Sequence, residues 1–184
     1  SIQDAKGNLT RYAYDALNRE TSITGPLGNS SHKAYDSRGR LVRFTDANGN
    51  ITQYSYDDAG NLAQETDPLG NVTTYSYDAQ NNRIQTQYPS GASSTSEYDG
   101  NNQLVRSINL SGAETSYEYD AAGNLIGQTN YMEYKTTFEY DDNNNRIAEI
   151  DAGGVRKDYT YDDLNRLITE TDALGNQTTH EYDV

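Results

Sequence analysis

The dipeptide Tyr-Asp recurs at a fixed interval of 21 residues along the whole chain. Its nine copies are Tyr14-Asp15, Tyr35-Asp36, Tyr56-Asp57, Tyr77-Asp78, Tyr98-Asp99, Tyr119-Asp120, Tyr140-Asp141, Tyr161-Asp162 and Tyr182-Asp183. A constant period of this length is typical of arrays in which each repeat is one supersecondary unit packed against its neighbours. We therefore expect one array of about nine repeats over residues 1–184, without capping repeats and cut from a longer array.

Two turn signals occur in each repeat when the Tyr of the Tyr-Asp pair is counted as position 0. Position 14 is Gly in all repeats except at Glu133: Gly7, Gly28, Gly49, Gly70, Gly91, Gly112, Gly154 and Gly175. Position 4 is Gly or Asn in every complete repeat, and all three prolines stand at position 12. Gly and Asn enter the left-handed region most easily, so each repeat is predicted to contain two turns. The Asp at position 1 is expected to accept hydrogen bonds from turn amides.

Two turns in 21 residues leave room for two strands of five or six residues, rich in Thr, Tyr, Val and Ile. The predicted fold class is all-β, with tandem antiparallel hairpins in one continuous, curved, spiral sheet. Alternation places positions 17, 19 and 0 on one face, as in Thr52, Tyr54 and Tyr56. A lone repeat is not expected to fold, because ordering its backbone costs more than its few apolar side chains offset.

The register of the hairpins is less strongly determined by the sequence. With a four-residue loop, the Leu at position 6 would face position 19, which pairs Leu41 with Tyr54 and Glu20 with Lys33. Because the period is odd, the two loops must differ, at roughly four and five residues, or a β-bulge must intervene. Position 7 is mostly apolar, as in Val42, and is expected on the opposite, otherwise polar face.

The composition excludes several classes of protein. Only 33% of the residues are hydrophobic and the mean hydropathy is −0.97, so no deep aliphatic core is expected. There is no Cys, which excludes disulfides and thiolate metal sites. The net charge of −14 would repel phosphate, so the expected partners include no nucleic acid, and no apolar stretch predicts membrane insertion. The expected partners are neighbouring repeats and other domains of the parent protein.

No catalytic residue, cofactor or metal site is predicted, and the chain is expected not to be an enzyme. The Asp-rich turn 141–145 lacks the Gly and Glu of a calcium-binding helical hand, and the two histidines, His32 and His180, lie far apart in the sequence. The row of Tyr side chains leaves open an alternative, a module that binds carbohydrate or a surface partner, although packing within the sheet is favoured. The turn at 130–134 lacks Gly and carries two Tyr and the only Met. It is interpreted either as a contact point or as a degenerate turn.

The segments Asp57-Asp58-Ala59-Gly60-Asn61-Leu62, Thr66-Asp67-Pro68-Leu69-Gly70-Asn71 and Thr74-Tyr75-Ser76-Tyr77-Asp78 closely resemble the YD repeat of Rhs proteins. The resemblance covers essentially the whole chain. Similar repeats occur in bacterial Rhs and wall-associated polymorphic toxins, in BC components of toxin complexes and in teneurins. The resemblance implies a secreted or cell-surface bacterial protein. It further implies a non-catalytic segment of a β-shell that encloses or displays a polypeptide such as a C-terminal toxin. The family's self-cleavage site and toxin domain have no counterpart here.

Overall fold

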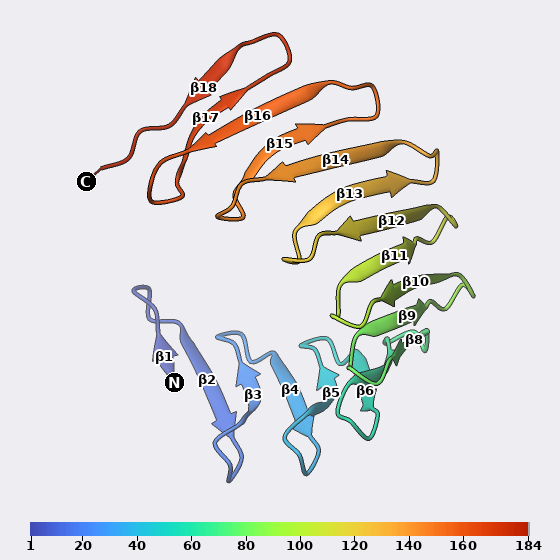
Figure 1. Ribbon diagram of the computed structural model, residues 1–184. Coiled ribbons are helices and arrows are strands. Elements are labelled where there is room, and N and C mark those ends of the chain that lie inside the picture. Colours follow the sequence, from blue (N-terminus) through green and yellow to red (C-terminus); the bar gives the residue numbers. More distant parts are fainter. Residues whose placement is uncertain (184) are drawn as a thin grey trace. The chain divides into compact units, whose positions relative to one another are not determined.

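The computed structural model describes residues 1–183 and contains eighteen β-strands in that range, with no helix. The chain forms two compact units, one of residues Ser1–Ser93 and one from Ser94 onwards (Figure 1). The first unit holds β1 (Ile2–Gln3), β2 (Leu9–Tyr14), β3 (Glu20–Thr24), β4 (Ser30–Tyr35), β5 (Leu41–Thr45), β6 (Ile51–Tyr56), β7 (Leu62–Thr66), β8 (Val72–Tyr77) and β9 (Arg83–Gln87). The other strands are β10 (Ser93–Tyr98), β11 (Leu104–Ile108), β12 (Glu114–Tyr119), β13 (Leu125–Asn130), β14 (Lys135–Tyr140), β15 (Arg146–Ile150), β16 (Arg156–Tyr161), β17 (Leu167–Thr171) and β18 (Gln177–Thr179).

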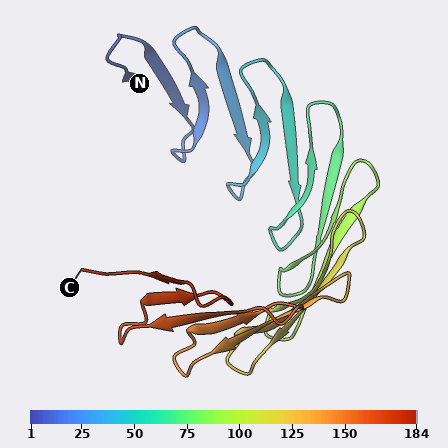
Figure 2. The same ribbon diagram turned by 90° about the horizontal axis from the view of Figure 1, so that it is seen from above.

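Within each unit, every strand pairs antiparallel with its neighbours in the sequence, and Figure 2 shows the hairpins following one another in chain order. The expected all-β fold of tandem antiparallel hairpins is confirmed. Two five-residue turns alternate along the array. The Tyr-Asp turn covers positions 1–5, as in residues 36–40, and the distal turn covers positions 11–15, as in residues 46–50.

A β-bulge follows each Tyr-Asp turn from Tyr14 to Tyr161. Across the turn between β4 and β5, Tyr35 pairs with Leu41 and Ala34 pairs with Arg43, so Val42 is an extra residue on β5. The same register shift occurs at the Tyr in β2–β3, β6–β7, β8–β9, β10–β11, β12–β13, β14–β15 and β16–β17. The odd period was expected to require either loops of different length or a β-bulge. The structure has the bulge: both loops have five residues, and the bulge holds the extra residue.

The expected register across the distal turn was wrong by one residue. Leu41 was predicted to face Tyr54, but in β5–β6 the pairs are Arg43 with Gln53 and Phe44 with Thr52. The physical reason is the loop length, because a five-residue turn shifts the pairing by one relative to a four-residue turn. Leu41 instead pairs with Tyr35 of the preceding strand.

The bulge also changes the face on which position 7 lies. In β5, Phe44 pairs with Lys33 at position 19, and alternation places Val42 on the same face as Phe44. Leu41 is opposite Tyr35 and shares its face. The expectation that position 7 would lie on the polar face was therefore wrong. Positions 0, 17, 19, 6, 7 and 9 form one face, which we call the tyrosine face, and positions 8, 10, 16, 18 and 20 form the polar face.

Few side chains are fully buried. In residues 1–183, only Thr86, Gly127, Ala148 and Tyr159 are buried, and most strand residues are half-buried or exposed. No second layer of strands or helices covers either face within the described part of the chain. Side chains therefore pack against neighbours within their own sheet, and stability has to come from strand-to-strand contacts.

The two turns of each repeat share one backbone conformation. In both turns the first residue exchanges backbone hydrogen bonds with the fifth and fourth residues: the Asp36 N–H donates to the Arg40 carbonyl (2.9 Å), and the Gly39 N–H donates to the Asp36 carbonyl (3.0 Å). The distal turn that begins at Asp46 repeats both bonds, with Gly49 as the fourth residue. This fourth residue has a positive φ in both turns, 84° at Gly39 and 86° at Gly49.

Glu133 is the exception at this site. It adopts φ 64° in the distal turn 130–134, and it is the one positive-φ residue in the described chain that is neither Gly nor Asn. Its N–H still donates to the Asn130 carbonyl at 3.0 Å, so the turn is formed in spite of the residue. A side chain in the left-handed region costs roughly 1–2 kcal/mol relative to the ordinary helical region.

We predict that Glu133→Gly stabilises the protein by about 1 kcal/mol, because Gly adopts this conformation without a Cβ clash. The midpoint of urea-induced unfolding measures the change. Gly154→Glu is the matched control, since Gly154 has φ +80° in the next distal turn and no heavy atom lies within 4 Å of a Cβ built there. That variant should lose a similar amount. A Glu133→Gly protein no more stable than the parent would contradict the strain.

Candidate functional site: the tyrosine face and the turn edge

In most repeats, the Tyr of the Tyr-Asp pair links neighbouring strands through its hydroxyl. The Tyr56 hydroxyl donates to the Leu41 carbonyl at 2.8 Å, from β6 to the first residue of β5. The same bond to position 6 of the preceding repeat is made by Tyr35, Tyr77, Tyr119, Tyr140, Tyr161 and Tyr182, at 2.8–3.0 Å. The β5–β6 ladder ends at Arg43 and Gln53, so this hydroxyl satisfies a carbonyl beyond the end of the ladder.

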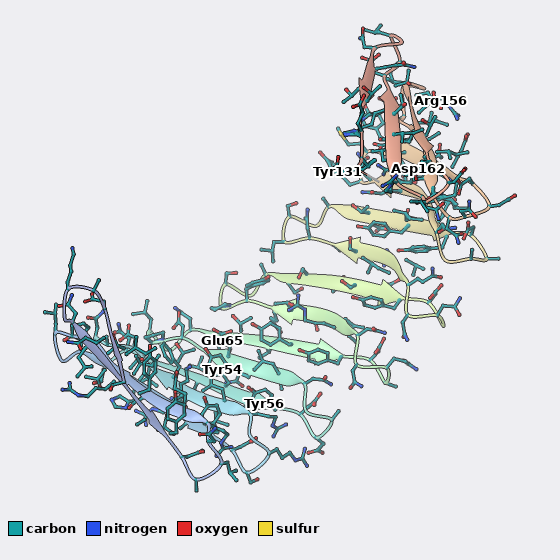
Figure 3. The ribbon with its side chains drawn as sticks, turned by 90° about the vertical axis from the view of Figure 1, so that its left-hand side faces the viewer. Tyr54, Tyr56, Glu65, Tyr131, Arg156 and Asp162 are labelled. Carbon is teal, nitrogen blue, oxygen red and sulfur yellow. The ribbon has the colours of Figure 1, made fainter. Side chains whose placement is uncertain are left out.

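The phenol rings on this face are partly withdrawn from water. Burial raises the pKa of the Tyr119, Tyr140 and Tyr161 hydroxyls. At position 19, burial is also the main cause of the raised pKa of Tyr54 and Tyr75, and the Glu65 carboxylate adds to it. Glu65 lies opposite Tyr54 on β7 (Figure 3). These rings are therefore packing elements of the sheet, half-covered by their neighbours.

In most turns the first residue is Asp or Asn, and its side chain accepts hydrogen bonds from the backbone of the turn. One oxygen of Asp36, Oδ1, accepts from the backbone N–H groups of Arg38 and Arg40, both at 2.9 Å. The other, Oδ2, accepts from Arg40 Nε at 2.7 Å. Asp46 does the same in the distal turn, with the N–H groups of Asn48 and Asn50 and with Asn50 Nδ2, all at 2.8 Å. The expected role of the position-1 Asp is confirmed, and a second Asp repeats it ten residues later.

These hydrogen bonds shift the acidity of the turn carboxyls. The Asn50 side chain and then the Asn50 N–H lower the pKa of Asp46. At Asp36 the largest cause is the Arg40 N–H. The pKa is lowered in the same way at Asp4, Asp15, Asp57, Asp67, Asp78, Asp120, Asp141, Asp162 and Asp172. A substantial part of the negative charge of the chain thus lies on groups that accept turn hydrogen bonds.

The polar face carries ion pairs that span three strands. Lys135 on β14 reaches Glu118 on β12 at 2.7 Å, passing over β13 at Gly127, where a Cβ would lie 3.0 Å from Lys135 Cε. In the next repeat, Arg156 reaches Glu139 at 2.8 Å from β16 to β14, across the strand that holds Ala148. Small residues at position 8 thus make room for the pairs. Because all four charged side chains are more than 40% exposed, each pair contributes little stability by itself.

An ion pair also joins Glu20 and Lys33, as the sequence predicted. Lys33 Nζ lies 2.7 Å from Glu20 Oε1, on the tyrosine face. The contact is diagonal, because the β3–β4 ladder pairs Ser22 with His32. The expectation was therefore correct for the contact and wrong for the register behind it.

The divergent turn 130–134 presents exposed apolar side chains. Tyr131, Met132 and Tyr134 are 64%, 48% and 58% exposed, and Tyr131 is marked in Figure 3. A shallow groove of about 720 Å³ runs between this turn and the distal turn 109–113, lined mainly by polar groups. Sequence analysis identified this turn as unusual, and the structure shows its rings exposed to solvent.

Comparisons with known proteins identify the family. The model of the RHS repeat matches residues 1–30, 35–72, 56–93, 98–131, 119–156 and 161–184, which together cover most of the chain. The chain belongs to the RHS repeat family. A comparison with curated protein sequences gave no match.

One solved structure shares the fold of this chain. The chain is similar to part of the Photorhabdus luminescens Tc holotoxin pore carrying the TccC3 D651A mutation, with 20% identity and a TM-score of 0.64. That match covers 82% of this chain and 9% of the other. A second match is TcdB2-TccC3 without its hypervariable C-terminal region, with 16% identity, a TM-score of 0.45, and coverage of 95% and 13%. The chain therefore spans a small part of the proteins it resembles.

In residues 1–183, no group of three or more His, Asp and Glu side chains is placed to hold a metal ion. The carboxylate of Asp141, from the rejected calcium turn, accepts hydrogen bonds from Asn143 and Asn145 of its own turn. His180 lies 3.3 Å from Glu170, and His32 is exposed on β4. No helix among these residues is long and apolar enough to cross a membrane.

Sequence reasoning missed the role of position 5 in these RHS repeats. Arg19 and Arg40 stack over Tyr35 and Tyr56 of the following repeat, at 4.8 and 4.5 Å from the ring centroids. Each also pairs with the Asp of its own turn, as in Arg40–Asp36 at 2.7 Å. The sequence sign of this contact is an Arg at position 5 followed by the Tyr-Asp pair of the next repeat.

We predict that Tyr56→Phe lowers the free energy of unfolding by about 1 kcal/mol, because the Leu41 carbonyl loses its hydroxyl donor while the ring remains. Urea unfolding measures the loss. Tyr14→Phe is the matched control, since the Tyr14 ring is 54% exposed and no hydroxyl bond of this kind is seen for it in the described chain. Equal losses in the two variants would contradict the proposed role of the bond.

We predict that Asp46→Ala destabilises the protein at neutral pH and that its effect disappears in acid. The folded state lowers the pKa of Asp46, so its contribution is present above the unfolded value of about 3.9 and is lost as the pH falls through the folded pKa. Thermal unfolding of both proteins between about pH 7 and pH 2 measures this convergence.

Asn109→Ala is the control for this pH dependence. The Asn109 side chain accepts from the N–H groups of Ser111 (2.9 Å) and Ala113 (3.1 Å) in the equivalent distal turn, but its amide does not titrate. The loss caused by Asn109→Ala should therefore stay constant across the same pH range. An Asp46→Ala loss that is equally constant would show that the carboxylate charge is irrelevant to the turn.

Proposed function

We propose that this chain is a non-catalytic wall segment of a larger RHS shell or scaffold, which encloses or displays a polypeptide such as a C-terminal toxin. The observation that carries the proposal is the use of the repeated side chains. Seven of the nine Tyr hydroxyls of the Tyr-Asp pairs donate to a carbonyl of the preceding repeat, and Asp side chains accept hydrogen bonds within most of the turns. These groups serve the construction of the array and are equivalent from repeat to repeat.

Further support comes from the likeness to the Tc holotoxin, whose solved structure shares this fold. The chain spans 9% of that protein, so the activity and partners of the whole belong to the proposal alone. In this proposal the array continues beyond residues 1–184, its partners are neighbouring repeats and other domains of the parent protein, and the parent is a secreted or cell-surface bacterial protein.

The coding sequence on both sides of residues 1–184 provides the first test. It should continue into further repeats of 21 residues and into a terminal domain with a different composition. In the full-length protein, limited proteolysis should cut that domain slowly. It should cut the domain faster after Tyr77→Ala, which removes one hydroxyl bond and one ring from the wall. A terminal domain cleaved equally fast in both proteins would contradict enclosure.

A glycan array separates the wall from the binding module considered as the alternative. The rings of Tyr54 and Tyr75 are half-buried, and the Tyr75 hydroxyl lies 3.4 Å from the Glu65 carboxylate. A wall predicts no specific signal on the array. A signal lost in Tyr54→Ala or Tyr75→Ala would favour carbohydrate binding over the wall.

A further inference from the structure

The Tyr-Asp turns touch one another along one edge of each unit, and the contact is made by position 5 of one repeat and position 4 of the next. We call this row of side chains the turn edge. It is formed in two different ways in the same chain. The two ways use different residue types at both positions.

In the first type of contact, a long side chain at position 5 faces a Gly. Arg19 Nη1 lies 3.3 Å from the Asp36 carbonyl of the next turn, and a Cβ built on Gly39 would be 3.6 Å from the same nitrogen. Arg40 repeats the arrangement, with Nη1 at 3.7 Å from a Cβ on Gly60. A side chain at either glycine would therefore begin in van der Waals contact with the guanidinium.

Gln103 makes the same type of contact in the second unit. Its Nε2 donates to the Gly123 carbonyl at 3.3 Å and would lie 3.4 Å from a Cβ at that residue. A shorter side chain at position 5 would not reach the glycine carbonyl. The long side chain at position 5 therefore packs against the glycine at position 4, where no side chain stands in its way.

In the second type of contact, Asn faces Asn. Asn124 Nδ2 donates to Asn144 Oδ1 at 2.8 Å, and it also donates to Asp120 of its own turn at 3.0 Å. The pairs Asn61–Asn81 and Asn145–Asn165 have the same bond at 2.8 Å. Here the position-4 residue supplies an acceptor that glycine lacks.

The sequence never mixes the two types. Along the chain the pairs of position 5 with the next position 4 are Arg19/Gly39, Arg40/Gly60, Asn61/Asn81, Asn82/Asn102, Gln103/Gly123, Asn124/Asn144 and Asn145/Asn165. Both Gly and Asn satisfy the positive φ of the turn, with 84° at Gly39 and 64° at Asn144, so backbone conformation alone does not explain the match.

We propose that the turn edge recognises the hairpin that packs against it, through matching of position 5 with position 4 of the incoming Tyr-Asp turn. An edge with Arg or Gln accepts a hairpin with Gly in the fourth turn position, and an edge with Asn accepts one with Asn. The partner is the next RHS hairpin of the same chain. Because the repeats share their Tyr, Asp and Gly positions, a slip by one whole repeat would keep both faces intact. After such a slip, an Arg or Gln edge would face an Asn turn, or an Asn edge would face a Gly turn, at some positions. These mismatched contacts would destabilise the slipped pairing.

A double-mutant cycle in the full chain tests this recognition. The four proteins are the parent, Asn124→Arg, Asn144→Gly and the double variant, and their folding equilibrium constants come from urea unfolding. Each single change creates a mismatch and should lower the constant about five-fold, as expected for loss of one hydrogen bond. Independent effects would multiply to about 25-fold in the double variant. Matching predicts a double variant within about three-fold of the parent, because the two changes together recreate the type of contact that Arg40 makes with Gly60.

The control combines Asn124→Arg with Asn165→Gly, which lies in the turn edge of a different pair. These two effects should multiply, since the residues do not face each other. Amide hydrogen exchange at residue 144 reports the same turn locally, through its N–H bond to the Asp141 carbonyl. Exchange should be faster in each single variant and return towards the parent rate in the matched double variant. If the effects of Asn124→Arg and Asn144→Gly simply multiply, the recognition is refuted.

Discussion

The β-bulge at each Tyr-Asp turn is the constraint on which the rest of the structure depends. It absorbs the odd residue of the 21-residue period, so successive tyrosines stay on one face. It also gathers Leu41 and Val42 on that face, where an unbroken strand would separate them. The tyrosine hydroxyl then satisfies the position-6 carbonyl beyond the ladder. One local irregularity, repeated in phase, therefore produces both a regular sheet and the contact between its strands.

Much of this fold could be predicted because the period exposes every position nine times over. The turns were readable from Gly49 and from its equivalents, since positive φ restricts the residue type. The register was not readable in the same way. The sequence does not show whether a turn has four or five residues, and the two lengths give different strand pairings. Leu41 was therefore assigned to Tyr54, whereas it pairs with Tyr35. Backbone acceptors, such as the Leu41 carbonyl, leave no mark on the sequence at all.

The two faces of the single-layer sheet are stabilised by different kinds of side-chain contact. On the tyrosine face, large rings and aliphatic side chains cover one another, and Tyr159 is the most buried of the rings. On the polar face, long charged side chains bridge alternate strands over Gly127 and Ala148. The positions of these small residues were not predicted, because their role appears only when strands two apart in the sheet are compared.

The carboxylates that close the turns also supply much of the net charge of −14. Much of the acidity of this chain therefore comes from carboxylates that are hydrogen-bonded within its turns. Any attempt to move its isoelectric point by neutralising these aspartates would loosen the hairpins at the same time. Each added repeat brings both its turns and the negative charge of their aspartates. Longer arrays of the same kind therefore become more anionic in proportion to their length.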